Sequence, residues 1–240
     1  MQNHRPHAHR EPRSLGAVPS ESNLLGDTLF VVQVIGALGV IVPMMVRNWT
    51  NIEGLSVSYF VVILAFLCLQ TTLAVPAHRA MPTRKTRQIL FMCALWLVLT
   101  AALLAEIWYR GMYVWDTNDT VTIVLTVFAL GLVALAFRLA RTPLSDPAAR
   151  GLMGVMTRAI PQLLQGTKIL VHGGGGVAGL SLLFANINTW IRLGHLALTR
   201  SEAKEERNRL WMLIPEVVNA FTWLLVSIAW LVWRVGWISP

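Results

Sequence analysis

Long apolar runs separated by short polar stretches divide most of the chain. The runs lie at about 27–46, 57–75, 88–108, 120–138, 152–171, 177–198 and 211–233. Each is close to the roughly 20 residues that a helix needs to cross a bilayer. Runs such as VTIVLTVFALGLVALAF do not alternate between apolar and polar residues, so they predict helices rather than the strands of a barrel. The pattern therefore predicts an all-α integral membrane protein with seven transmembrane helices.

The composition favours a membrane protein over a soluble one. Of the 240 residues, 55% are hydrophobic and 13% are charged, whereas soluble domains carry about a quarter charged residues. The net charge of +8 does not require a nucleic-acid partner, because basic residues in a membrane protein gather on one side of the bilayer. Residues 1–26, rich in His, Arg and Pro, predict a disordered polar tail, and residues 234–240 a short C-terminal tail.

The Lys and Arg residues predict the orientation of the helices. Most fall in the N-terminal tail or after the second, fourth and sixth runs, namely Arg5, Arg10, Arg13, Arg79, Arg84, Lys85, Arg87, Arg138, Arg141, Arg150, Arg200, Lys204, Arg207 and Arg209. On the opposite side are Arg47, Arg110 and Arg234. Because short cytoplasmic loops carry the excess of basic residues, the count predicts a cytoplasmic N-terminus and an external C-terminus. The protein is expected in the plasma (inner) membrane.

An internal repeat relates two parts of the chain. Pro43 precedes Gly-Leu-Ser at 54–56, and Pro161 precedes Gly-Leu-Ser at 179–181. Repeats of this kind often underlie the architecture of membrane carriers. The two hairpins that carry these residues are therefore predicted to be equivalent.

The repeat extends over three helices in each copy. ALWLVLT at 94–100 resembles FTWLLVS at 221–227, so residues 27–108 match residues 152–233. A single helix, with its flanking loops, fills the linker at 109–151. An odd number of helices in the linker gives both units the same orientation, which predicts a 3+1+3 arrangement of two parallel three-helix repeats.

One hairpin carries residues that resemble a known motif. Pro161-Gln162, followed by a loop and Gly-Leu-Ser, resembles a PQ-loop motif, and Pro43-Met44 matches it more loosely. The 3+1+3 plan is similar to that of the PQ-loop/SWEET superfamily of membrane proteins, which includes sugar carriers, amino-acid exporters and a sorting receptor. The resemblance implies transport of a small solute. Seven-helix members usually have the N-terminus outside, the reverse of the charge-based orientation, and we follow the charges.

Two prolines are predicted hinges. Proline inside a helix removes a backbone hydrogen bond and clashes with the preceding turn, so the helix kinks. Pro43 and Pro161 occupy equivalent helices of the two units. Paired kinks would let two bundles rock around a central site, whereas the alternative is an ordinary kink in each helix.

Amides and indoles are the predicted solute-binding groups: Gln162, Asn186, Asn188, Asn219, Trp96 and Trp223. An amide in hydrocarbon needs a partner and should face the bundle interior. There it offers donors and acceptors to a hydroxyl-rich solute such as a sugar, although it can equally join helices to one another. Asn186 and Asn188 are two residues apart, so they cannot point the same way. Trp96 and Trp223, at matching repeat positions, would form apolar walls.

Three charged residues fall deep inside predicted helices. Arg158, Arg192 and Glu216 lie at similar depths from the basic side, and an unpaired charge there is costly, so Glu216 should pair with one of the arginines. Either the pair locks the second unit together, or Glu216 couples protons, or an arginine holds an anionic solute. Lys168 and Glu106 lie near helix ends and are expected to extend toward the headgroups.

The sequence points away from enzymes and cofactors. It contains no recognisable catalytic constellation, metal cluster or phosphate cradle, and the glycine run at 173–176 is interpreted as a flexible connector. The predicted partners are a small-molecule solute and membrane lipid, without nucleic acid, and a homo-oligomer is left open. The predicted function is a facilitator or proton-coupled carrier of a small polar solute, a sugar being one candidate. The alternative is a non-transporting membrane receptor or accessory protein with PQ-loop architecture.

Overall fold

The computed structural model describes residues 24–80, 82–111, 113, 115–143, 146–198 and 203–237. Within them the chain forms helices and no strand. The helices are α1 (Leu24–Asn48), α2 (Val57–Ala80), α3 (Arg84–Tyr109), α4 (Thr117–Leu139), α5 (Pro147–His172), α6 (Gly179–Leu198) and α7 (Ala203–Val235). These are the seven predicted helices, and α7 begins several residues before the predicted apolar run. Residues 1–23 of the predicted N-terminal tail lie outside the described residues.

Polar side chains determine where three of the helices begin. Thr83 caps α3, Asp116 caps α4 and Asp146 caps α5, each accepting a hydrogen bond from a backbone N–H of the first turn. Pro147 then occupies the start of α5, where its missing N–H has no partner to lose. These capping residues explain why the three helices begin a few residues before their apolar runs.

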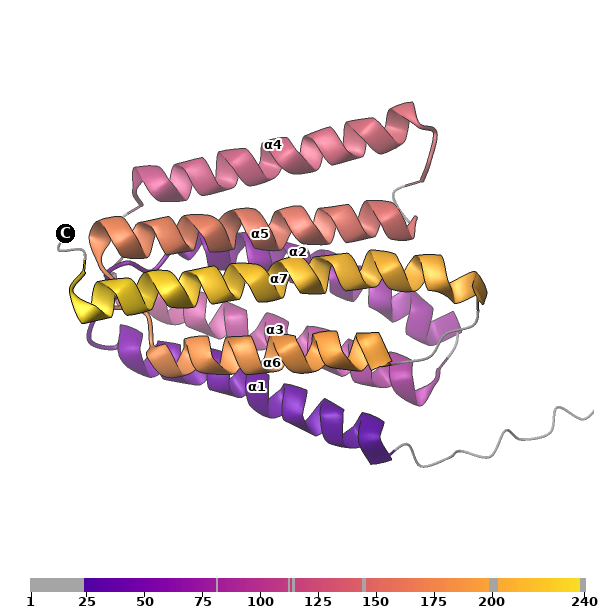
Figure 1. Ribbon diagram of the computed structural model, residues 1–240, viewed down its shortest axis with the longest axis horizontal. Helices are drawn as coiled ribbons and strands as arrows, with labels where there is room; N and C mark the ends of the chain where they lie inside the picture. The colour runs from indigo at the N-terminus through magenta and orange to yellow at the C-terminus, as the bar shows by residue number, and fades with distance from the viewer. Residues whose placement is uncertain are drawn as a thin grey trace, which may run out of the picture.

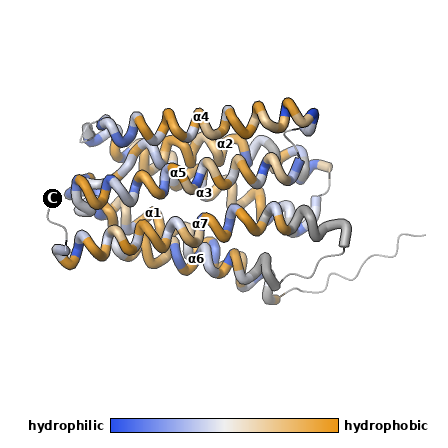
Figure 2. Tube along the Cα trace, turned by 45° about the horizontal axis from the view of Figure 1, so that its top comes forward, coloured by the Kyte–Doolittle hydropathy of each residue, from blue (hydrophilic) through white to orange (hydrophobic). Residues whose placement is uncertain are grey.

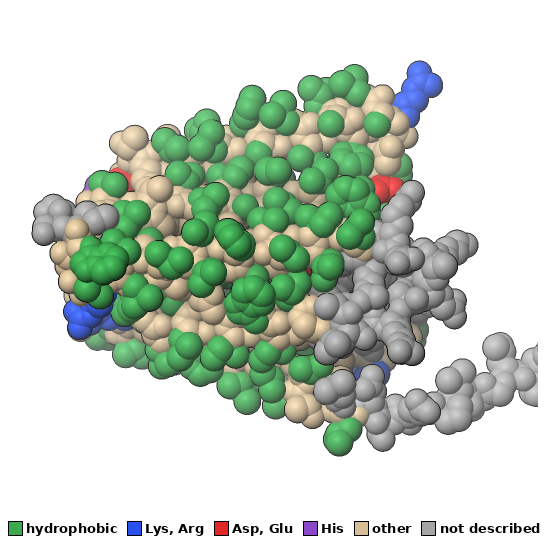
Figure 3. All heavy atoms as spheres, in the orientation of Figure 1, with side chains coloured by type: hydrophobic (Ala, Val, Ile, Leu, Met, Phe, Trp, Pro, Cys, Tyr) green, Lys and Arg blue, Asp and Glu red, His purple; other side chains and the backbone are tan. Residues whose placement is uncertain are grey.

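The outer surface of the bundle is apolar. On α4, the side chains of Val127, Phe128 and Leu132 each keep more than half of their surface exposed. Figure 3 shows hydrophobic side chains spread over the visible face, whereas charged side chains gather toward its two ends. Large exposed apolar surfaces are unfavourable in water and suited to lipid.

Five helices are long and apolar enough to cross a membrane. They comprise Gly26–Asn48, Val57–Ala80, Thr86–Tyr109, Thr117–Leu139 and Leu213–Val235. The five helices indicate an integral membrane protein. In the described residues, α5 and α6 fall outside this group because they carry more polar residues. Several of the polar residues of α5 are buried, namely Thr157, Gln162, Gln165 and Lys168.

The helices lie side by side along one direction (Figure 1), and their neighbours follow a pattern. α3 contacts both α1 and α2, and α7 contacts both α5 and α6. In the described part of the chain, α1 does not contact α2 and α5 does not contact α6. Between the groups, α1 packs on α6 and α2 packs on α5, while α4 packs on α5 and α2. The hydropathy colouring in Figure 2 shows apolar residues along all of these helices.

The connections at one end of the bundle are packed against each other. The N–H of Gly176 donates to the carbonyl of Glu53 at 2.7 Å, and Nε of Arg47 donates to the carbonyl of Gly175 at 2.6 Å. Gly54 has a φ of 72°, and a Cβ there would lie 1.6 Å from the carbonyl oxygen of Gly173. The glycine run is thus buried and bonded, which differs from the flexible connector that the sequence predicts. Its glycines permit close backbone approach.

The contact between α5 and α7 is the most extensive in the fold, and small residues permit it. Pro215 lies inside α7, so the carbonyl of Trp211 lacks its usual N–H donor four residues on. Gly151 of α5 faces this carbonyl, and a Cβ there would lie 2.6 Å from its oxygen. Small residues let membrane helices approach closely in this way.

We expect Gly151→Ala to destabilise the fold, because the added methyl must push α5 away from α7. Overpacking of this kind lowers the free energy of unfolding by roughly 1–3 kcal/mol. The matched control is Gly131→Ala in α4, where nothing lies within 4 Å of the added Cβ. Thermal unfolding of both variants in detergent measures the difference, and equal midpoints would contradict the close packing described here.

Candidate solute-binding cavity

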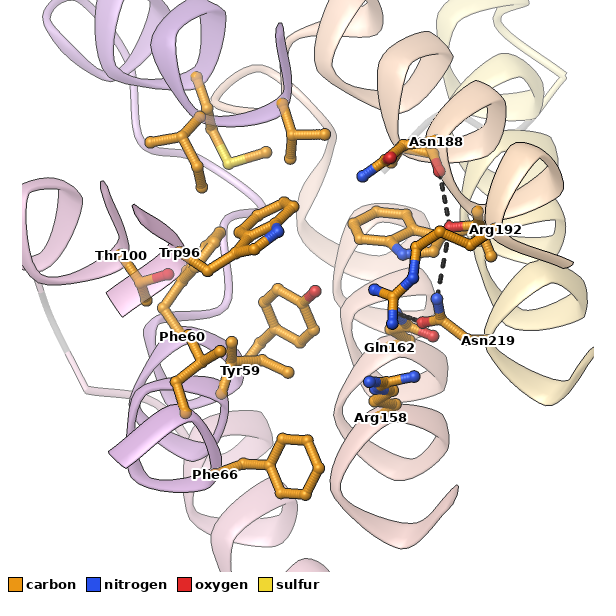
Figure 4. Close-up of a pocket in the computed structure, with 18 residues that line it drawn as sticks. Tyr59, Phe60, Phe66, Trp96, Thr100, Arg158, Gln162, Asn188, Arg192 and Asn219 are labelled. Carbon is orange, nitrogen blue, oxygen red and sulfur yellow. Dashed lines mark hydrogen bonds between the residues drawn. The ribbon is translucent and has the colours of Figure 1, made fainter. Parts of the chain in front are cut away.

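A cavity of about 110 Å³ lies in the middle of the bundle, large enough for several water molecules. Its 18 lining residues come from α1, α2, α3, α5, α6 and α7 (Figure 4). α4 contributes none of them. The cavity therefore lies between the helices that precede α4 in the chain and the helices that follow it.

The two sides of the cavity differ in chemistry. The α1–α3 side is mainly apolar and aromatic, with Met44, Phe60 and Trp96 among its residues. The α5–α7 side carries Arg158, Gln162, Asn188, Arg192 and Asn219. Figure 4 shows the aromatic side chains facing this polar group across the cavity. A solute with one apolar part and one polar part would match both sides.

The predicted amides Gln162 and Asn219 form a network in the polar wall. Nε2 of Gln162 donates to Oδ1 of Asn219 at 2.8 Å, and Nδ2 of Asn219 donates to the hydroxyl of Thr189 at 3.3 Å. The hydroxyl of Thr222 donates to Oε1 of Gln162. These amides therefore line the cavity and also join α5, α6 and α7.

The two asparagines of α6 point in different directions, as their spacing predicts. Asn188 is buried, lines the cavity, and has no partner for Oδ1 among the described residues. Asn186 instead donates to the hydroxyl of Ser227 at 2.8 Å and to the carbonyl of Leu182, and it does not line the cavity. The structure thus separates Asn186 from the other predicted binding residues and gives it a contact with α7.

The predicted tryptophans and prolines lie around the same cavity. Trp96 and Trp223 both line it, and Trp223 meets Tyr59 edge to face, with ring centroids 6.0 Å apart. Pro43 and Pro161 lie inside α1 and α5 but do not line it. The residues directly after them, Met44 and Gln162, do line it. In both helices, therefore, the residue after the predicted hinge proline lines the cavity.

The three charged residues predicted deep inside the helices meet at one carboxylate oxygen. Nη1 of Arg158 lies 2.6 Å from Oε1 of Glu216, and Nη2 of Arg192 lies 2.8 Å from the same atom. Glu216 is buried, and its Oε2 has no partner among the described residues. The sequence predicts one arginine partner, and the structure has two. One negative charge is shared by two positive charges beside the cavity.

A second charged cluster, which the sequence analysis misses, lies toward the end where the connections pack. Asp119 of α4 is fully buried and accepts bonds from Lys168 at 2.8 Å and from the hydroxyl of Ser58 at 2.7 Å. Lys168 also lies 2.8 Å from Asp116. The expectation that Lys168 extends toward the headgroups is wrong, because the residue is buried and paired within the bundle. Its acidic partners, Asp116 and Asp119, lie at the start of α4, the helix that precedes α5 in the chain.

Two further side chains lie beside this cluster: Gln165 bonds to the connection between α1 and α2, and Tyr113 reaches the cluster from the connection between α3 and α4. The side-chain amide of Gln165 donates to the carbonyl of Gly54 at 2.6 Å and accepts from the N–H of Ser56 at 2.7 Å. Tyr113 donates its hydroxyl to Asp119 at 2.8 Å. Burial, followed by the hydrogen bond and negative charge of Asp119, raises the pKa of Tyr113. Tyr113 therefore remains a neutral donor in this cluster.

Comparisons with known proteins add no assignment to this geometry: no family model, curated protein or solved structure matches the chain. Among the described residues, no group of three or more His, Cys, Asp or Glu could hold a metal ion. The chemistry of the site is therefore that of hydrogen bonds, fixed charges and apolar contact.

We expect Lys168→Met to destabilise the protein, because it leaves the buried carboxylate of Asp119 without its cation. Breaking a buried ion pair by removing one partner costs about 3–5 kcal/mol. The control is Arg84→Gln, which removes an ion pair with Asp27 whose arginine is 63% exposed and which should cost about 1 kcal/mol or less.

Thermal unfolding in detergent measures both variants of this comparison. Adding Asp119→Asn to Lys168→Met should recover part of the loss, because the unpaired charge is then removed. A Lys168→Met variant as stable as the Arg84→Gln variant would contradict a structural role for the buried cluster.

Proposed function

We propose that this protein is a membrane transporter of a small polar solute, of the PQ-loop/SWEET type. It acts as a facilitator or proton-coupled carrier in the plasma (inner) membrane, with a cytoplasmic N-terminus as the basic residues indicate. Two bundles, α1–α3 and α5–α7, rock about the central cavity while α4 links them. The observation that carries the proposal is a cavity at the boundary between these two groups, lined by residues of both.

The contacts between helices support the two-bundle arrangement. In each group the third helix lies between the first and the second. An axis that exchanges α1 with α5, α2 with α6 and α3 with α7 would turn the α1–α6 contact into the α5–α2 contact, and both contacts are present. Met44 with Gln162, and Trp96 with Trp223, are pairs at matching repeat positions that line the cavity. A solute site between parallel repeats is typical of carriers that work by alternating access.

The packing beyond the cavity supports a site that is closed at one end. A smaller cavity of about 10 Å³ shares Met44, Tyr59 and Trp223 with the larger one and reaches Gln165 and Val177. Beyond it, the connections meet at Gly54, with its close approach to Gly173. A carrier must close one end of its path while the other admits solute.

The alternative function is a non-transporting membrane receptor or accessory protein with the same architecture. The observation that favours this alternative is that the polar residues are bonded to one another. The amide network and the Glu216 ion pairs join α5, α6 and α7. Such a network can serve a rigid scaffold as well as a moving one.

We expect Asn219→Ala to reduce solute flux by at least about fivefold, because it removes a cavity-lining amide and leaves Gln162 without its acceptor. The matched control is Asn186→Ala, which removes an amide that bonds to Ser227 outside the cavity and should keep most of the flux. The assay uses the full chain in liposomes with labelled sugars, amino acids and small carboxylates. Absence of flux for all three classes with the unaltered protein contradicts transport and favours the receptor or accessory function.

A further inference from the structure

The charges beside the cavity do not balance. Arg158 and Arg192 both line it, and no acidic residue is among the 18 lining residues. Glu216 is the only acidic group within ion-pair distance of either arginine in the described residues, and it supplies one negative charge through one oxygen. One positive charge is therefore left over at the cavity wall. An uncompensated charge at this depth is costly, and binding an anion would remove the cost.

The two guanidinium groups retain donors for such an anion. A guanidinium has five N–H donors, and each arginine uses one of them on Glu216. The Arg192 side chain keeps 36% of its surface exposed, compared with 18% for Arg158. Figure 4 shows both arginines on the same side of the cavity as Gln162 and Asn219. Guanidinium groups match the planar, two-oxygen geometry of a carboxylate.

One amide adds a polar group to the same wall. Asn188 is 5% exposed and lines the cavity. Its Oδ1 has no partner among the described residues and packs near Gly36 of α1, where an added Cβ would lie 3.1 Å from it. The amide therefore contributes polarity to the wall, whereas the unbalanced charge is what specifies an anion.

The opposite wall and the size of the cavity limit the rest of the anion. Phe60 and Trp96 face the arginines across a space of about 110 Å³, which Ile63 also lines. This apolar surface suits a short hydrocarbon body and gives little compensation for a ring of hydroxyl groups. A neutral sugar would also leave the spare positive charge in place.

We propose that the cavity binds a small monocarboxylate, with its carboxylate on Arg192 and Arg158 and its apolar body against Trp96 and Phe60. This inference rests on the proposed function in taking the cavity as the solute site, and it names the substrate class. One negative charge on the ligand matches the one positive charge left by the two arginines and Glu216.

A binding measurement on the full chain in lipid nanodiscs tests the substrate class. The probes are butyrate, the neutral solute glucose and the cation butylammonium, and the readout is tryptophan fluorescence, because Trp96 and Trp223 line the cavity. We expect butyrate to bind at least about tenfold more tightly than either other probe, which corresponds to about one charge-assisted hydrogen bond. Glucose or butylammonium binding as tightly as butyrate overturns the inference.

Two substitutions test the role of the charge. Asn188→Asp keeps the shape of the side chain and neutralises the spare charge, so butyrate binding should weaken by at least about tenfold. Glu216→Gln leaves two unpaired arginines, so preference should move from butyrate to the dianion succinate. The control Arg138→Gln changes an exposed arginine of α4 outside the cavity and should leave butyrate binding unaltered. Unchanged butyrate binding in Asn188→Asp overturns the inference even if Glu216→Gln fails to fold.

Flux measured beside binding separates this inference from the proposed function. Butyrate binding without flux of any solute supports the monocarboxylate site and contradicts transport. Flux of glucose without butyrate binding supports transport and overturns the monocarboxylate site. Uptake of butyrate that Asn188→Asp abolishes, while Arg138→Gln preserves it, supports both.

Discussion

A stripe of four polar side chains on α5 organises the interior of this protein. Arg158, Gln162, Gln165 and Lys168 follow one another at intervals of three or four residues, so they share one face of the helix. Each needs a partner because hydrocarbon offers none. The partners come from different parts of the chain: Glu216 and Asn219 on α7, the connection at 54–56, and Asp119 on α4. The need to pair one polar stripe thus specifies how the neighbouring elements pack on α5.

The stripe also explains why α5 is less apolar than the five helices that are apolar enough to cross a membrane. Polar residues lower the hydropathy of a helix, yet α5 is the helix with the most extensive contact, against α7. Its buried positions include Gly151, Gly154 and Gly166 beside the polar stripe, so close packing and polar pairing occupy the same face. α4 differs from α5 in that large apolar side chains cover most of its exposed surface. A helix of low hydropathy can therefore lie inside a membrane bundle when its polar groups are paired within it.

The parts that the sequence predicts are those that depend on position along one helix. Apolar run length predicts the helices. Counting turns from the basic side predicts that Arg158, Arg192 and Glu216 share one layer and that Glu216 pairs with one of the two arginines. The missed parts depend on the connections. Lys168 lies near a helix end by residue count, but Asp119 and Asp116 from the start of α4 reach it and remove the need to extend outward. A sequence reading assigns no partner across such a connection, because the packing of α4 on α5 is not encoded by periodicity.

The cluster around Asp119 bears on how the proposed carrier would change state. Asp119 accepts bonds from Ser56 and Ser58 at the start of α2 and from Lys168 on α5, so it bridges the two groups of helices at the closed end. Separating the bundles there breaks one set of these bonds and also parts the backbones at Gly54 and Gly173. The ion pairs of Glu216 impose no such constraint, because all three residues belong to α5–α7 and can move together. In the proposed cycle, the energetic barrier to opening this end therefore includes the Asp119 cluster and the bonds between the two connections, while the charges at the cavity remain in place to hold the solute.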